Sequence, residues 1–325
     1  MEEVKTPNLQ PELQQNLGQN LQPDKKRQEK PVKLHKKRKM TVADYIILAF
    51  MIGFAVMTVY PFWFVIIGSL NDGQDYILGR VFWLPRKFSF DSYLYVFLDS
   101  RLYTGFIVTV AKTVVGTACS LTFTAAVAYA LSNPRLKFRN FFYKTSLFCM
   151  FFNGGLIPFF VWMVELGLYE NFWVYILPAL YSTYNMIIIS RFFRDIPEEL
   201  REAAIVDGAG EWRIMFTIYF RLSGPVFATV GLWLAVGQWN DYYTTMLYCP
   251  TSTHLHSLQY YLMKVIKLAS APPDTSNVPP EVMQSIASQT VSYAAIVIAA
   301  IPILCAFPYI QRHLKTGAVD GSLKG

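Results

Sequence analysis

Long stretches without charge dominate the chain after residue 40. A helix needs about 20 mostly apolar residues to cross the hydrocarbon core of a bilayer. Six stretches reach about that length, which is more than a large soluble helical core would require. The pattern therefore predicts an all-α integral membrane protein with six transmembrane helices, at residues 45–71, 102–134, 145–164, 171–190, 222–240 and 282–311.

Prolines at positions where a helix could kink stand out in two of these predicted spans. Pro158 lies in the third span, and Pro302 and Pro308 lie in the sixth. Proline removes a backbone donor and clashes with the preceding turn, so we expect kinks at these places.

The composition supports a membrane protein and the charge distribution predicts its orientation. Hydrophobic residues make up 53% of the chain and charged residues only 16%, whereas soluble domains have about 25% charged residues. The net charge is +7, and the Lys and Arg residues concentrate in the N-terminal arm, two alternate loops and the C-terminal end. Because cytoplasmic segments carry the excess of Lys and Arg, both termini are expected in the cytoplasm.

Residues 1–40 form a polar, basic arm that we expect to be disordered and cytoplasmic. Residues 41–325 form the membrane domain. The block Lys36–Lys39 borders the first span, where it would set topology beside anionic lipid, and no other feature favours nucleic-acid binding. The first span is too long for a signal-peptide core and is expected to remain as an anchor.

The cysteines and histidines do not have the spacing of a metal site, so we expect no bound metal and no disulfide. The residues concerned are Cys119, Cys149, Cys249, Cys305, His254 and His256.

The loop at about 191–223, between the fourth and fifth spans, carries the most specific pattern. Pro197 followed by two glutamates suits the first turn of a helix, and Asp207-Gly208 suits its end. A short helix is predicted from Pro197 to Val206, and a second from Glu211 to Leu222. The small residues beside the turn let another backbone approach closely, which suggests a docking element, although an amphipathic surface helix has the same composition.

This loop resembles the EAA motif of ABC importer permeases. Glu202-Ala203-Ala204, then Gly208, then Ile218 have the spacing of that motif. The family continues with Leu-Pro, where this chain has Phe220-Arg221, so Pro225 is expected to provide the break instead. The resemblance implies docking on an ATP-hydrolysing subunit through Glu202, Ala203, Ala204, Asp207, Gly208 and Ala209.

Further segments are similar to the carbohydrate branch of these permeases. They are Ala126–Ser132, Phe152–Pro158, Trp239-Asn240 and Gly321–Gly325. The chain is identified as a member of the carbohydrate ABC importer permeases, maltose-type and nearest the oligosaccharide and polysaccharide-fragment importers. The resemblance implies that Gly321, Lys324 and Gly325 contact the ATPase subunits.

The resemblance also implies the partners. We expect a heterodimer with a second permease subunit, two ATPase subunits that use ATP-Mg, and an extracytoplasmic sugar-binding protein at the bacterial cell membrane. No G-x-x-x-x-G-K-[ST] motif occurs in the sequence, so the chain is not expected to hydrolyse ATP or to be an enzyme. A permease for another solute, such as a peptide, is the alternative, and a membrane-embedded enzyme is a weaker one.

Polar groups within the spans are candidates for the substrate path. Lys112 would pair with a carboxylate such as that of an acidic sugar, pair with the partner subunit, or reach the membrane surface. Asn153, Gly154 and Gly155 would either expose backbone groups to sugar hydroxyls or only bend the span. Trp239, Asn240 and Tyr242 would contact sugar or anchor the membrane interface. The outer segment 250–284 contains Leu258–Leu262, which resembles the family's loop toward the binding protein.

Overall fold

The structure is a computed structural model that describes residues 41–79, 81–268 and 287–322. The basic arm and the outer segment 271–280 lie outside these residues. The chain divides into two units, residues 1–57 and 58–325. The described part of the first unit is helical, and its apolar side chains are exposed, as suits contact with lipid.

The described residues are helical, and three helices are long and apolar enough to cross a membrane: α2 (Val42–Ser69), α5 (Ser100–Ser132) and the first part of α16 (Ser288–Ser322). Three bent helix pairs raise the number of spans to as many as six. The structure therefore agrees with the predicted all-α architecture. The remaining helices before the docking loop are α3 (Gly73–Leu78), α4 (Asp91–Leu98), α6 (Arg139–Phe151), α7 (Leu156–Glu165), the 3-10 turns η1 (Phe172–Tyr175) and η2 (Leu177–Ala179), and α8 (Thr183–Arg194).

The docking loop and the segments after it contain α9 (Glu198–Val206), α10 (Glu211–Ile214), a π-helical turn (Met215–Tyr219), α11 (Phe220–Leu222), α12 (Gly224–Asn240), α13 (Tyr243–Tyr248), the 3-10 turn η4 (Thr253–Leu255) and α14 (Leu258–Leu268).

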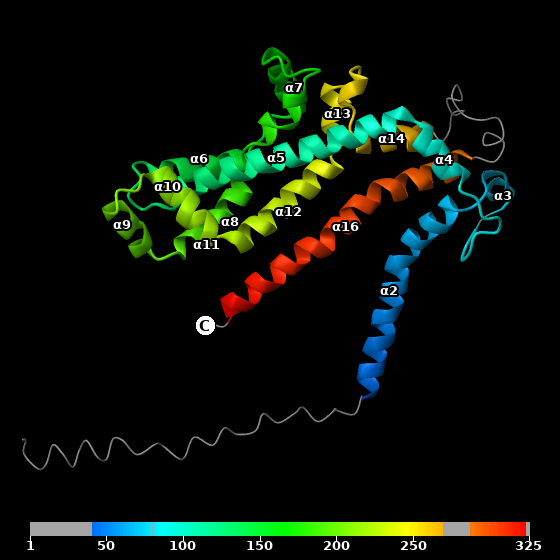
Figure 1. The fold of residues 1–325 in the computed structure, drawn as a ribbon, viewed down its shortest axis with the longest axis horizontal. Helices are drawn as coiled ribbons and strands as arrows, with labels where there is room; N and C mark the ends of the chain where they lie inside the picture. The colour runs from blue at the N-terminus through cyan, green and yellow to red at the C-terminus, as the bar shows by residue number, and fades with distance from the viewer. Residues whose placement is uncertain (1–40, 80, 269–286, 323–325) are drawn as a thin grey trace, which may run out of the picture. The chain divides into compact units, whose positions relative to one another are not determined.

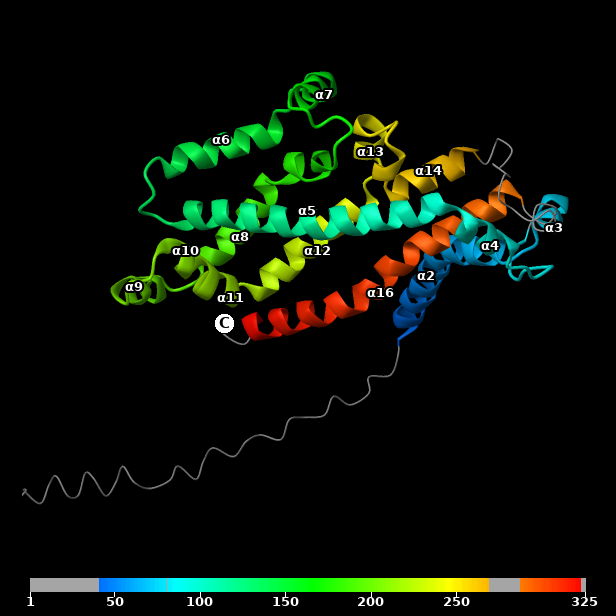
Figure 2. The same cartoon turned by 45° about the horizontal axis from the view of Figure 1, so that its top comes forward.

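Helix α5 is the central element of the second unit. It packs against α8, α12 and α14, and Figures 1 and 2 show α5 running alongside α8 and α12. Asp99 caps its first turn by accepting a hydrogen bond from the Arg101 amide, and no proline interrupts its 33 residues. Its small residues allow close packing: a Cβ at Gly105 would lie 3.2 Å from the backbone of Leu258.

Two predicted spans, the third and the fourth, contain a bend, and a further bend precedes the fifth. The third breaks at residues 152–155, and α6 and α7 meet at 113°. In the fourth, Pro178 lies in η2, and the segment turns by 51° before α8 begins. The fifth predicted span is the single helix α12, which the Glu211–Leu222 segment meets at 88°, with Pro225 in the first turn of α12 beside this break.

The prolines in the sixth span do not break it. Helix α16 continues through Pro302 and Pro308 to Ser322. The third predicted span is thus interrupted at the Gly-Gly segment before Pro158, whereas α16 stays helical through Pro302 and Pro308, and a kink at these two prolines stays a prediction. Glycine adds the backbone freedom that proline alone does not, and Gly155 adopts φ +92°.

Candidate functional site

The docking hairpin consists of α9, the turn after it and α10. Helix α9 ends as predicted: Gly208 adopts φ +78°, its amide donates to the Ile205 carbonyl at 2.9 Å, and the Ala209 amide donates to Ala204 at 2.9 Å. This left-handed termination satisfies the last carbonyls of the helix and is the conformation that favours glycine. The predicted helix from Pro197 to Val206 is therefore confirmed, with Pro197 as its N-cap.

The hairpin presents a small-residue surface to its surroundings. Ala203, Asp207 and Gly208 are exposed, whereas Ala204 and Ala209 are half-buried. A Cβ at Gly208 would meet no atom within 4 Å. Val206, beside this notch, is 86% exposed, so the hairpin leaves apolar area open to another surface.

Glu202 lies on the same hairpin but points to the chain's own α5–α6 loop. Its carboxylate accepts a hydrogen bond from Arg135 Nη2 at 2.6 Å, and both side chains are more than half exposed. An exposed pair of this kind contributes little stability, so the carboxylate stays available for exchange with another cation.

A second network, which the sequence pattern did not reveal, fastens the hairpin from inside. Arg201 is buried and binds Glu198 at 3.1 Å and Glu211 at 2.5 Å. Tyr129, near the end of α5, donates to the second oxygen of Glu211 at 2.5 Å. The hydrogen bond to Glu211 raises the pKa of Arg201 above its already high ordinary value, so this cation stays charged. Only the fold brings residues 129, 201 and 211 together, and no spacing rule predicts that contact.

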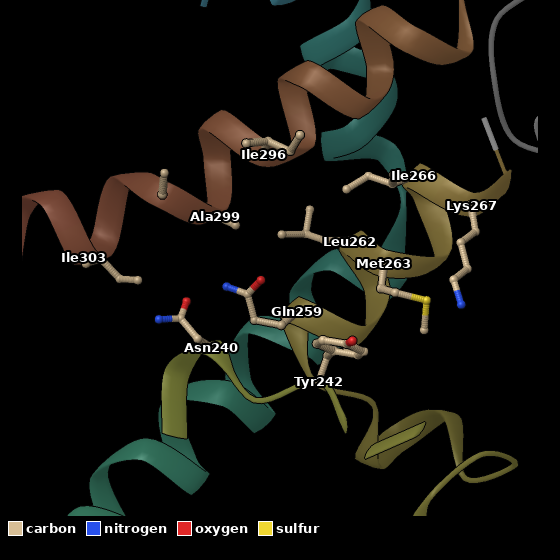
Figure 3. Close-up of a pocket in the computed structure, with 11 residues that line it drawn as sticks. Asn240, Tyr242, Gln259, Leu262, Met263, Ile266, Lys267, Ile296, Ala299 and Ile303 are labelled. Carbon is tan, nitrogen blue, oxygen red and sulfur yellow. The ribbon is translucent and has the colours of Figure 1, made fainter. Parts of the chain in front are cut away.

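A groove of about 470 Å³ lies where α12, α14 and α16 meet. Asn240 is the last residue of α12, Tyr242 lies just before α13, and Gln259 lies in the first turn of α14. Figure 3 shows the amides of Asn240 and Gln259 next to one another on the side of α16, with Lys267 at the opposite end. The apolar lining residues are Leu262, Met263, Ile266, Ile296, Ala299, Ala300 and Ile303.

This groove has the chemistry of a site for a polar, uncharged or anionic solute. Its polar groups are two amides, a phenol and an ammonium, and no carboxylate is among the described side chains that line it. Ala299 and Ile303 belong to the apolar part of α16, so the groove lies at the depth of a predicted span. A few convergent polar groups on apolar walls are typical of small-molecule sites.

The predicted path residues divide between this groove and other places. Asn240 and Tyr242 line it, but the neighbouring Trp239 is buried, turned toward α5, with its ring 6.1 Å from that of Phe106. Gln259 is a lining residue that the sequence reading missed, because it lies in a segment expected to be an outer loop.

The Asn153–Gly155 segment is exposed at the break between α6 and α7 and does not line the groove. Asn153 accepts a hydrogen bond from the Gly155 amide at 2.9 Å, which stabilises the turn itself. Of the two alternatives for this segment, the bend of the span is present. The segment does not lie with Asn240 and Tyr242 at the groove.

Lys112 is fully buried and does not reach the groove. Its ammonium donates to the Asp241 backbone carbonyl at 2.6 Å and lies 3.1 Å from the Asp241 carboxylate. It also lies 4.9 Å from the centre of the Tyr175 ring. The carboxylate that it pairs with belongs to its own chain, which was none of the predicted partners.

Leu258–Leu262 begins α14, where Leu258, Tyr260, Tyr261 and Leu262 are buried and the Leu258 amide donates to Thr109 of α5 at 2.8 Å. Its expected contact with the binding protein stays a prediction. In the predicted tail, Gly321 belongs to α16, whereas Lys324 and Gly325 lie outside the described residues.

Comparisons with known proteins identify relatives of this chain. The chain is 36% identical over 288 residues to the polygalacturonan/rhamnogalacturonan transport system permease protein YtcP of Bacillus subtilis (strain 168), which covers 87% of this chain and 98% of the relative. It is 36% identical to protein LplC of the same organism over 297 residues, 90% of this chain and 98% of that one.

A solved structure is also similar. A chain of a bacterial ABC transporter involved in the import of the acidic polysaccharide alginate has a TM-score of 0.75 and 32% identity, covering 84% of this chain and 98% of that one. The family model for the binding-protein-dependent transport system inner membrane component matches residues 38–318. This chain belongs to the family of binding-protein-dependent transport system inner membrane components, the permeases of ABC importers.

Proposed function

We propose that the chain is a permease subunit that carries an oligosaccharide across the bacterial cell membrane in an ATP-driven importer. The observation that carries this proposal is the groove at span depth, where Asn240, Tyr242 and Gln259 offer hydrogen bonds beside apolar walls. Sugars present hydroxyls along their edges and apolar C–H faces, so they match such a lining. The names of the relatives support a carbohydrate rather than a peptide.

In this proposal the chain forms a heterodimer with a second permease subunit and performs no chemistry itself. Two ATPase subunits bind ATP-Mg and dock on the hairpin at Gly208, and a sugar-binding protein delivers the solute from outside. The hairpin, the N-terminal arm and the tail Gly321–Gly325 then lie in the cytoplasm. ATP binding favours one state of the membrane domain because the ATPase dimer contacts the two states unequally.

We further propose that the transported oligosaccharide carries carboxylates. Alginate is an acidic polysaccharide, and polygalacturonan is by its name a chain of galacturonic acid units. In the groove, Lys267 supplies a cation, and the described residues pair it with no carboxylate within salt-bridge distance. A carboxylated sugar would provide that counter-charge.

Uptake by the reconstituted importer tests both statements. Vesicles containing both permeases and the ATPase, with the binding protein outside, receive labelled oligogalacturonate, a neutral galactooligosaccharide or a peptide. ATP-dependent uptake of a sugar supports the permease assignment, and uptake of the peptide alone contradicts it.

The charge of the substrate is tested with two lysine variants. Lys267→Gln is expected to raise the KM for oligogalacturonate about tenfold, which corresponds to about 1.4 kcal/mol. Lys264→Gln is the matched control, because Lys264 on the same helix lies over the Tyr260 ring, 4.5 Å from its centre, and does not line the groove. Equal KM values in both variants contradict the proposed role of Lys267.

A further inference from the structure

Helix α5 carries two polar attachments, one to the docking hairpin and one to the groove. Near the C-terminal end of α5, Tyr129 binds Glu211, and near the middle of α5, Lys112 binds Asp241. The two positions are 17 residues apart in the 33-residue helix, which places them about 25 Å apart along its axis.

The first attachment joins three elements. Glu211 begins α10 and accepts from Tyr129 of α5 through one oxygen and from Arg201 of α9 through the other. Arg201 is also paired with Glu198 in the first turn of α9. Both helices of the hairpin are therefore tied to α5 through a single carboxylate.

The second attachment joins α5 to the backbone that builds the groove. Asp241 lies between Asn240 and Tyr242 in the sequence, and both of these line the groove. Lys112 holds the carbonyl as well as the carboxylate of Asp241, and the other carboxylate oxygen accepts from the Thr244 amide at 3.0 Å. The position of the groove-lining residues thus depends on a cation fixed in α5.

Helix α5 is suited to pass a displacement between these attachments. It has no proline, and it packs along its length against α8 and α12 (Figure 2). We infer that α5 transmits movement of the docking hairpin to the substrate groove, with Tyr129 and Lys112 as positioning residues at its two attachments. This inference rests on the proposed function, since it assumes that a partner ATPase moves the hairpin.

The decisive variant is Tyr129→Phe, which removes one hydroxyl and keeps the aromatic packing of Tyr129 against Phe193 and Tyr219. Tyr181→Phe is the matched control, because the Tyr181 hydroxyl binds Ser146 and not the hairpin. Uptake per ATP hydrolysed should fall at least about fivefold in Tyr129→Phe, a size typical of lost coupling, and stay at the native value in Tyr181→Phe.

A spectroscopic readout separates transmission from substrate chemistry. A spin label at Tyr243→Cys, beside the groove, reports local motion after the exposed native cysteines Cys149 and Cys305 are replaced by serine. Trapping the ATPase with ATP and vanadate should change the label's spectrum in the native background and in Tyr181→Phe. The change should be absent in Tyr129→Phe and in Lys112→Met.

The outcomes distinguish the two proposals. A label that responds to trapping in Tyr129→Phe as it does in the control, or native uptake per ATP in that variant, overturns the inference. If the label responds to trapping in the native background but not in Tyr129→Phe, transmission through α5 is supported. If at the same time no sugar is taken up, the proposed substrate is contradicted. Because Tyr129→Phe changes one atom, its assembly into the membrane complex, measured by co-purification of the ATPase, is expected to equal that of the control.

Discussion

The ammonium of Lys112 lies 3.1 Å from the carboxylate of Asp241, and the two side chains differ in exposure: that of Lys112 is 0% exposed and that of Asp241 is 23% exposed. Removing one partner from a buried ion pair leaves the other charge uncompensated. The cost therefore depends on which charge remains, because a carboxylate that still reaches its surroundings is less costly than a fully enclosed ammonium.

Asp241→Leu is expected to destabilise the protein more than Lys112→Met. The first change strands the enclosed ammonium and should lower the free energy of unfolding by about 3 kcal/mol, and the second should cost less. The double variant should recover part of the loss, since neither charge remains. Thermal unfolding of the detergent-purified protein measures the stability of the two single variants and the double variant. The pairing would be contradicted if the single variants lost equal stability and the double variant lost the sum of the two.

Gly208 allows the backbone and the surface of the docking notch to be tested separately. Asparagine adopts positive φ more readily than other residues with a side chain, whereas valine is strained there. If the notch must stay open for a partner, Gly208→Asn should lower uptake by the importer although the protein keeps its Tm. Gly208→Val should lower both. Full uptake by Gly208→Asn would show that only the backbone conformation matters at this position.

At Gly105, α5 comes close to the backbone of α14. A Cβ there would lie 3.2 Å from the Leu258 backbone, which cannot move aside as a side chain can, so Gly105→Ala should cost about 1–3 kcal/mol. In Gly231→Ala the new Cβ would make ordinary contact at 3.6 Å with the Leu121 side chain, so its unfolding temperature should stay near the native value. Similar Tm values for the two variants would contradict the packing at Gly105.

Protonation of Glu170 is expected to make the stability of the protein depend on pH. Burial acts to raise its pKa, but hydrogen bonds from Ser252 and Thr251 outweigh this and lower the pKa from 4.5 to about 2. Because the pKa is lower in the folded chain, its contribution to stability is complete above about pH 4.5 and is lost as the pH falls toward 2.

The measurement is the Tm between pH 6 and pH 3. Native protein should lose more of its Tm over this interval than Glu170→Gln, which has no carboxylate to protonate. The carboxylate joins the segment before η1 to residues 251–252, with its oxygens 2.6–3.0 Å from Thr251 and Ser252. Parallel pH curves for the two proteins would show that this contact does not stabilise the fold.

The sequence predicted local features well and long-range contacts poorly. The helix ending at Val206 followed from Pro197, two glutamates and Asp-Gly, all of which act within a few residues. The contact of Tyr129 with Glu211 joins positions 82 apart, and only packing brings them together.

The same distinction explains the errors at the groove. Asn240 and Tyr242, which line the groove, are candidates from the sequence because they lie at the end of a span, whereas Gln259 lies in the segment 250–284, which the sequence predicts as an outer connection. Its first part instead packs as α14 on α5 and α16. Lys112 was recognised as an unusual intramembrane charge, whereas its partner Asp241 follows the end of a span, where a charge is ordinary.

The central claim is that this chain passes carbohydrate through a membrane under the control of a partner ATPase. It is tested most directly by reconstituting the chain with its second permease and ATPase in vesicles and measuring uptake of labelled oligogalacturonate with the binding protein outside. We expect accumulation that requires both ATP and the binding protein and that is lost in Gly208→Val. Accumulation without ATP, or accumulation of peptide but of no sugar, would contradict it.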